Sequence, residues 1–502
     1  MAGSLSQGKA AARNRWMERC RVALIAVVLA GAMCRIAQYA ARTSFWGDES
    51  FIILNITDHT CRELLGPLDH GQAAPPAFLW IERAAALSLG VNEYSLRLYP
   101  LLCGLIALPL FARLSWRLGC GLPAVLGTAF FAFADKLISF SAELKQYSGD
   151  VLAAVVLLLI ATCPKSSPLR KLAWAAGFTA VAVWFTHTSA IVFGSVAIVL
   201  FAQCWRRGYR QALPAMAVGL VPVISFAALY LLSIRHEHTS WMHEGWKDDF
   251  PDWSHPAHVP IWLGRHIYQV GDFAYRSWSP LILLMAELGI AGLWRARRFD
   301  LLGMLLLPAG LTLLAAFAGQ FPFNGSRVTL FLLPPLFLLC AAGMQFVRDI
   351  LPNSIRRAWW ILPAPLAAWG LIFGAYHLVF PRLHTYIRPV VAYVRAHRQP
   401  GEAIYLADVG VGIRQDPNPH EGRRLELFCY WPRPSPPVHL AWPRSMTDIR
   451  EKRFWIVFPF RAGHREDKKQ IAKLLGDAKT IATEKSRFIE PRGGAAYLFE
   501  HR

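Results

Sequence analysis

Long apolar runs recur through the first 380 residues, and short polar stretches separate them. A helix needs about 20 apolar residues to cross a bilayer, and the runs have this length or come close to it. They lie at 22–41, 96–112, 118–134, 150–163, 172–186, 188–204, 212–233, 280–294, 301–318, 328–347 and 358–380. The pattern predicts an α-helical polytopic membrane protein with about eleven transmembrane helices.

The pattern changes after residue 383. Short β-like runs, AIYLA (403–407), FWIVFPF (454–460) and AAYLF (495–499), appear in a more polar background, with the amphipathic stretch REDKKQIAKLLGD between the last two. We therefore expect a transmembrane domain over 1–383 and a small α/β extramembrane domain over 384–502. The long segment 42–95 is the first external loop, and its PPAFLWIERAAALSLG stretch predicts a helix on the membrane surface that begins at a proline pair.

Composition and charge agree with a membrane protein. Of the 502 residues, 54% are hydrophobic and 17% are charged, whereas soluble domains carry about a quarter charged residues. The net charge is +20. Lys and Arg residues cluster in every second loop between the apolar runs and are nearly absent from the short loops in between. By the positive-inside rule this predicts a cytoplasmic N-terminus and an external C-terminal domain, and it removes the reason to expect a nucleic-acid partner. The first run is expected to be an uncleaved helix rather than a signal peptide, since no clear cleavage site precedes Arg42.

The stretch FWGDESF (45–51) places two adjacent carboxylates, Asp48 and Glu49, where the first apolar run ends. Like charges repel, and a low-dielectric boundary disfavours ionisation. Two interpretations stand at this point: a solvated acid pair at a helix end, or a catalytic acid pair.

Several motifs in order then resemble the GT-C class of membrane glycosyltransferases, on the branch related to protein O-mannosyltransferases and aminoarabinose transferases. The resemblance rests on the acid pair, GQAAPPAFLW, NEYSLRLYPLLCGLIALPLF, SAELKQYSGD, FPFNGSRVTLFLLP and KRFWIVFPF. It covers about residues 40 to 460. It implies transfer of a sugar from a polyprenyl-phosphate donor to an acceptor hydroxyl on a lipid, glycan or protein, with inversion at the sugar.

The resemblance also implies roles for individual residues. Asp48 matches the loop acid that acts as the base, and Glu49 supports it. Lys145 and Tyr147 are candidates for binding the donor phosphate, with Glu143 holding Lys145, and Arg327 is a second candidate cation. Aminoarabinose transferases carry a lysine where this chain has Ala74, so Gln72 and His70 are expected to contribute in its place. For Lys145 and Arg327 the alternative is contact with lipid headgroups alone.

Other polar residues carry weaker signals. Six histidines, His236, His238, His243, His255, His258 and His266, crowd the loop 234–279, but no tight metal-binding spacing is present, so no metal or other cofactor is expected and a divalent ion is the alternative. Tryptophans in the same loop favour contact with headgroups. Cys61 and Cys429 could form a disulfide between external segments.

The sequence predicts a multi-pass enzyme of the plasma (inner) membrane, with membrane lipids as partners. The rival from another class is a transporter or flippase for lipid-linked saccharides, which would favour internal repeats and binding residues at the bilayer midplane. No repeat is visible, and the candidate polar residues gather on one predicted side. A scaffold with a decayed site is a third possibility. Which sugar and which acceptor are used does not follow from the sequence.

Overall fold

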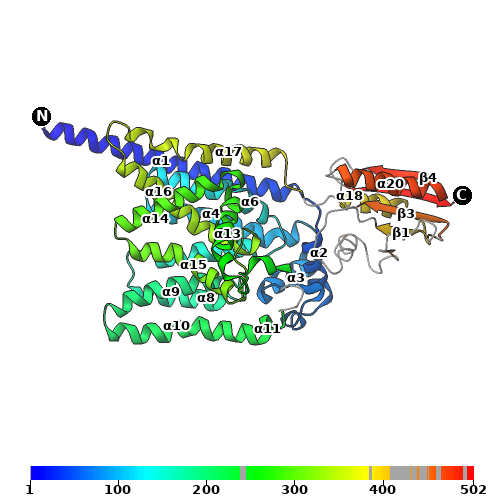
Figure 1. The fold of residues 1–502 in the computed structure, drawn as a ribbon, viewed down its shortest axis with the longest axis horizontal. Helices are drawn as coiled ribbons and strands as arrows, with labels where there is room; N and C mark the ends of the chain where they lie inside the picture. The colour runs from blue at the N-terminus through cyan, green and yellow to red at the C-terminus, as the bar shows by residue number, and fades with distance from the viewer. Residues whose placement is uncertain are drawn as a thin grey trace.

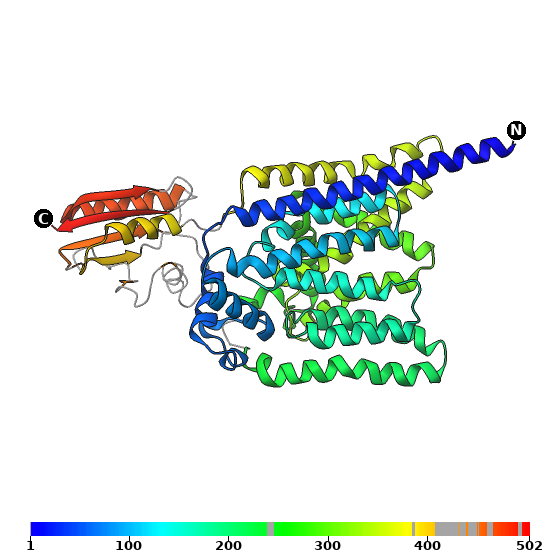
Figure 2. The same cartoon turned by 180° about the vertical axis from the view of Figure 1, so that it is seen from behind.

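The computed structural model describes residues 2–237, 245–383, 387–406, 430, 438–439, 449, 451–458, 465–489 and 494–501. A helical bundle and a small α/β domain lie end to end along the longest axis of the molecule (Figures 1 and 2). The N-terminus and the C-terminus lie at opposite ends of the molecule. The helices of the bundle lie before residue 384 and the elements of the α/β domain lie after it, and the division of the chain at residue 383 stays a prediction.

The bundle helices follow the apolar runs. They are α1 (Ala2–Ala40), α4 (Leu98–Leu118), α5 (Leu122–Phe133), α7 (Tyr147–Ala161), α8 (Pro168–Ala182), α9 (Ser189–Trp205), α10 (Tyr209–Leu229), α14 (Ser279–Arg295), α15 (Phe299–Phe317), α16 (Leu333–Ile350) and α17 (Ala364–Val379). Prolines open α5, α8, α14, α16 and α17, where the missing N–H costs no intrahelical bond.

Within the described ranges, six helical stretches are long and apolar enough to cross a membrane. Four further apolar helices are shorter: Leu122–Phe133, Tyr147–Ala161, Ser189–Trp205 and Ala364–Val379. The polytopic helical fold is as predicted, and the count of eleven spans stays a prediction.

The bundle core is one continuous apolar cluster built by nearly all of these helices. Helices α14 and α16 pack closely together, because small residues let the two backbones approach each other. A Cβ added to Gly289 would overlap the carbonyl of Leu339, and one added to Gly343 would overlap the carbonyl of Met285. Such small-residue contacts are a common way for helices to pack in membranes, where association gains little from burying apolar surface.

Short helices form a layer between the bundle and the α/β domain (Figure 1). The segment 42–95 supplies α2 (Gly47–Asp58), η1 (Glu63–Leu65), η2 (Asp69–Gly71), α3 (Pro76–Leu89) and η3 (Ser95–Arg97), and α6 (Asp135–Phe140) follows α5. The predicted surface helix is α3. Its first turn is fixed by a hydrogen bond of 2.9 Å from the Ala77 N–H to the carbonyl of Trp184, in the turn after α8.

The segment after α10 contains structure that the sequence did not predict. It holds η4 (Tyr230–Ile234), α11 (Arg235–Glu237), η5 (Lys247–Asp249), η6 (Pro256–His258), the 17-residue helix α13 (Val259–Tyr275) and η7 (Arg276–Trp278). Two 3-10 helices flank α16: η8 (Arg327–Leu332) before it and η9 (Arg356–Ile361) after it.

The C-terminal domain is a five-stranded sheet in the order β2-β1-β3-β5-β4. Its elements are α18 (Arg388–His397), β1 (Ala403–Leu406), β2 (Val438–His439), β3 (Arg453–Phe458), α20 (Arg465–Ile481), β4 (Ala482–Ile489) and β5 (Ala495–His501). β1 pairs in parallel with β2 and β3, whereas β3, β5 and β4 pair antiparallel. The three β-like runs and the amphipathic helix are present as predicted, and β4 was not predicted.

Candidate functional site

Asp48 lies in the first turn of α2, where the positive end of the helix dipole favours a carboxylate. Its side chain is mostly covered and forms an ion pair with Arg327, the first residue of η8. The guanidinium of Arg327 also lies 5.9 Å from the ring centre of Trp46, the residue that caps α2. The structure therefore joins the expected base to one of the two expected phosphate-binding cations.

Glu49 has different surroundings from its neighbour. It is fully buried, and the guanidinium of Arg97 grips it with two bonds of 2.8 and 2.6 Å. Its carboxylate also accepts the backbone N–H of Leu144 at 2.8 Å. Glu49 has no surface open to a substrate. Its bonds connect α2 to Arg97 at the start of α4 and to Leu144 in the 141–146 loop, and we call the Arg97–Glu49 pair a brace.

Arg97 completes that brace and was not singled out in the sequence. It donates to the carbonyls of Thr43 and Ser44 at 2.7 and 3.2 Å, and so fixes the chain just before Asp48. A buried charge is tolerated only when it is paired and hydrogen-bonded, and this pair meets both conditions. Arg97 stands within the quoted NEYSLRLYPLL stretch, but nothing in the spacing points to Glu49 as its partner.

Lys145 lies in the loop before α7, one residue from the Leu144 amide that binds Glu49. Its ammonium is buried and donates to the side-chain oxygen of Gln72 at 3.0 Å. Burial lowers the pKa of Lys145 to about 8, and the charges of Glu49 and Glu143 oppose this shift. Gln72, which the resemblance led us to expect in place of a lysine at Ala74, is thus in direct contact with Lys145.

The remaining predicted residues lie around the same loops. Glu143 is buried and accepts a hydrogen bond from Ser139 at 3.3 Å. Tyr147 opens α7 and packs edge-on against Phe140. His70 lies in η2, and its side chain is outside the described part of the structure.

Hydrogen bonds between polar side chains fix the loop that precedes Arg327. Asn324 donates to Asp249 at 2.5 Å, and Ser326 donates to Asn324 at 2.5 Å. Asp249 also lies 3.7 Å from the ring of His266, which is buried on α13. A Cβ at Gly325 would overlap the carbonyl of Gln269 on the same helix, so the loop lies directly against α13. The helix that the sequence did not predict therefore positions Arg327.

The histidine-rich segment gives no metal centre among the residues described. No group of three or more His, Cys, Asp or Glu side chains in those ranges could hold an ion. His238 and His243 lie outside the described residues, as does Cys429, which the sequence allowed as a disulfide partner of Cys61.

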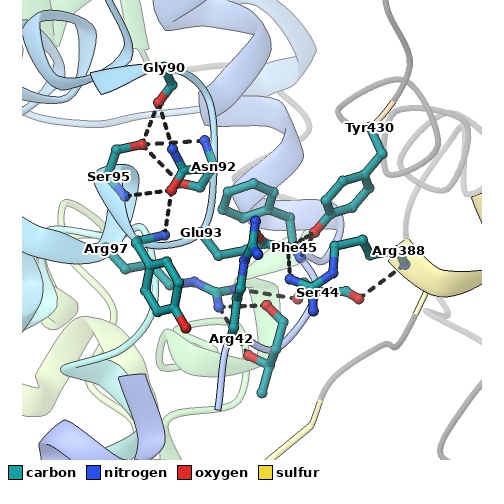
Figure 3. A network of polar contacts seen from close by, with 12 residues as sticks. Arg42, Ser44, Phe45, Gly90, Asn92, Glu93, Ser95, Arg97, Arg388 and Tyr430 are labelled. Atoms are coloured by element: carbon teal, nitrogen blue, oxygen red, sulfur yellow. Dashed lines mark hydrogen bonds and ion pairs between the residues drawn. The ribbon is translucent and has the colours of Figure 1, made fainter. Parts of the chain in front are cut away.

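A second buried network joins the C-terminal domain to this layer (Figure 3). Glu93 is buried and binds Arg42 at 3.1 Å and Arg388 of α18 at 2.8 Å. Tyr430 donates its hydroxyl to Glu93 at 2.8 Å and accepts the Phe45 N–H at 2.7 Å. The C-terminal domain thus holds the chain three residues before Asp48, through residues that sequence reasoning did not select.

Glu82 on α3 is a fully buried carboxyl in the layer of short helices. Among the residues that the structure describes, neither of its oxygens has a hydrogen-bond partner. Burial, aided by the charge of Glu49, raises its pKa well above the ordinary range.

No family model matches the sequence, and no curated protein matches it either. Solved structures do match. Arabinofuranosyltransferase AftD from Mycobacteria has a TM-score of 0.50 at 14% identity, over 95% of this chain and 40% of that one. ArnT from Cupriavidus metallidurans, solved with undecaprenyl phosphate, has a TM-score of 0.47 at 13% identity, over 95% and 97% of the two chains. The Archaeoglobus fulgidus oligosaccharyltransferase has a TM-score of 0.49 at 12% identity, and the match covers 86% of this chain and 67% of that chain.

All three proteins are GT-C glycosyltransferases. At such low sequence identities the likeness concerns the fold alone. The TM-score of 0.50 to AftD supports that likeness. The chain therefore has the polytopic helical fold of the GT-C membrane glycosyltransferases and is an integral membrane protein.

Proposed function

We propose that this protein is a glycosyltransferase that moves a sugar from a polyprenyl-phosphate donor to an acceptor hydroxyl, with Asp48 as the base. The Asp48–Arg327 pair carries the proposal, because it brings a carboxylate at the start of α2 and a cation at the start of η8 together. The GT-C fold supports the reaction class, and the buried Lys145 supplies a second positive charge in the same layer.

In the proposed reaction the acceptor oxygen attacks the anomeric carbon. Its proton passes to the Asp48 carboxylate, a new C–O bond forms, and the bond from the sugar to the phosphate breaks. The polyprenyl phosphate leaves with the bonding electrons, so negative charge grows on its oxygens. A cation beside those oxygens lowers the barrier because it binds the transition state more strongly than the ground state. Direct attack gives inversion at the anomeric carbon.

Arg327 has two tasks in this scheme. In the structure it neutralises Asp48. When a donor phosphate arrives, the guanidinium turns to the phosphate in a two-pronged contact, which frees the Asp48 carboxylate to accept a proton. Donor binding would thus activate the base.

The proposal includes an orientation and a division of the chain. The N-terminus is cytoplasmic, about eleven helices cross the membrane within 1–383, and the layer 42–95 and the domain 384–502 are external. Cysteine labelling at Arg13 and Asp408 tests this, because reagents that do not cross the membrane should reach only the second position in intact cells.

The function is tested by transfer. Purified protein in lipid nanodiscs is given a panel of polyprenyl-phosphate sugars and acceptor lipids, and release of polyprenyl phosphate is followed. Donor-dependent release that Asp48→Asn abolishes supports the enzyme. Movement of intact donor between leaflets without release, in vesicles holding the same protein, would instead identify a flippase.

A further inference from the structure

A pair of adjoining cavities lies at the end of the bundle opposite Asp48. The larger, of about 570 Å³, is enclosed by the C-terminal turns of α4, α14 and α16 and the start of α15. The smaller, of about 400 Å³, shares Leu118, Arg298 and Leu301 with it. Arg327 comes before α16 and the cavities lie along the far part of that helix, so they are separate from the candidate site. We call the two together the basic crevice.

The depth of the crevice is apolar. Leu293, Leu301, Leu305 and Leu338 are buried side chains on its wall, contributed by α14, α15 and α16. Its α16 wall runs from Leu338 to Ile350, which at 1.5 Å per residue is roughly 18 Å along the helix. A space this long and this apolar suits a hydrocarbon chain better than a compact polar molecule.

The mouth of the crevice is strongly basic. Arg295 and Arg298 line the larger cavity, and Arg117, Arg297 and Arg298 line the smaller one. The two acids at the mouth already have cationic partners: Asp349 pairs with Arg348 at 3.2 Å and Asp300 lies 3.6 Å from Arg206. Positive charge is therefore left in excess where the apolar channel opens.

The backbone of Arg297 supplies an independent observation. Its φ of 53° is in the left-handed region, at the end of α14 where glycine is the usual residue. Residues other than glycine are uncommon in this region, and such residues cluster at functional sites. Here the side chain is one of the arginines that line the crevice.

The neighbouring surface places the mouth at headgroup level. Trp294 and Phe299 are exposed beside it and pack edge-on against each other, and Trp205 is exposed at the end of α9. Exposed tryptophans gather where a membrane protein passes from hydrocarbon to headgroups. The apolar depth then lies in the hydrocarbon layer and the arginines lie among phosphates.

We propose that the basic crevice is a binding site for one anionic phospholipid of the membrane, with the phosphate at Arg295, Arg297 and Arg298 and one acyl chain along α16. Arginine holds phosphate in a two-pronged contact, and the charge excess at the mouth selects an anionic over a zwitterionic headgroup. Lipid in the crevice would join α4, α14 and α16 where the bundle is hollow, and so stabilise the fold without touching the candidate site.

The test compares lipids on the full-length detergent-purified protein. Phosphatidylglycerol should raise the melting temperature more than phosphatidylcholine at equal concentration, and native mass spectrometry should retain one anionic lipid. Arg298→Gln should weaken the apparent affinity for phosphatidylglycerol roughly tenfold, since it removes a charged contact to phosphate. Ala296→Trp, an exposed change at the mouth, should block retention without disturbing the core.

Arg210→Gln is the matched control. Arg210 is an exposed arginine at the start of α10 and does not line the crevice, so its variant should respond to lipid as the wild type does. Equal loss in Arg210→Gln and Arg298→Gln would mean diffuse surface attraction and overturn the proposal. So would equal stabilisation by phosphatidylcholine. Stabilisation by glycerol phosphate alone would also overturn it, because that ligand has no acyl chain.

Discussion

Asp48 and Arg327 form an ion pair although 279 positions separate them in the chain. Two braces hold the partners independently. Arg97 and Glu49 fix the start of α2, and Asp249 and Asn324 fix the loop before η8. If Arg327 turns to a donor phosphate as proposed, this pairing would keep the Asp48 carboxylate neutralised until that phosphate is bound.

The Arg97–Glu49 brace should matter for folding as well as for the position of Asp48. Glu49→Gln leaves the buried Arg97 charge without its counter-charge, so we expect about 3–5 kcal/mol of lost stability. Thermal unfolding of the purified variants measures it. Arg42→Gln is the matched control, since Arg42 is a more exposed partner of Glu93 and Arg388 remains. Similar melting temperatures for the two variants would contradict the brace.

Lys145 should make phosphate binding depend on pH. Its pKa is lowered to about 8, so the ammonium is charged below that pH and neutral above it. The affinity for undecaprenyl phosphate should therefore fall as pH rises through about 8, by equilibrium binding to the purified protein. Lys145→Arg keeps the charge at high pH and should flatten the profile. An unchanged profile in Lys145→Arg would assign the dependence to another group.

Glu82 should lower stability as pH rises. Its folded-state pKa is raised, so above the ordinary carboxyl value of about 4.3 the unfolded chain ionises first and gains free energy that the folded protein cannot. Glu82→Gln should then raise the melting temperature, and more at pH 8 than at pH 5.

Glu63 provides a control of opposite sign for Glu82. Its carboxylate accepts the Thr60 N–H, and that bond lowers its pKa. Its small stabilising effect is present above the ordinary carboxyl pKa and is lost as pH falls through the lowered value. Glu63→Gln should therefore leave the melting temperature unchanged or slightly lower at neutral pH. A gain in both variants would point to a general charge effect.

Tyr430 should couple the C-terminal domain to the layer that carries Asp48. Tyr430→Phe removes the hydroxyl that bonds Glu93 and the Phe45 N–H, at a cost of about 1–3 kcal/mol. We expect a lower melting temperature and faster proteolytic release of the C-terminal domain. Tyr209→Phe, an exposed tyrosine on α10, is the control. Release at the wild-type rate would show that the Arg388–Glu93 pair is sufficient.

Much of the fold could be predicted because apolar runs dictate helices in a membrane. The apolar run at 328–347 contains most of α16, and the REDKKQIAKLLGD stretch forms most of α20. Element α13 was missed because its polar and aromatic residues suggest a loop at headgroup level, whereas packing against the Asn324 loop makes it a helix. Strand β4 was missed because its charged residues alternate on an edge strand with little apolar signal.

The site could be predicted only in part. Asp48 could be selected as a candidate from its position directly after the first apolar run. The structure adds that its neighbour Glu49 is buried and bonded to Arg97. The pairings Asp48–Arg327, Lys145–Gln72 and Glu93–Arg388 join segments far apart in the chain. No local pattern encodes such contacts, because the packing of the helices creates them.

The central claim is that Asp48 is the base of a sugar transfer, and Asp48→Asn tests it most directly. The change keeps the shape of the side chain and removes its basicity, so turnover with a polyprenyl-phosphate sugar should fall on the order of 10²–10⁴-fold. Binding of undecaprenyl phosphate should be kept or strengthened, because Arg327 loses its competing carboxylate. Wild-type turnover in Asp48→Asn, with normal donor binding, would contradict the account.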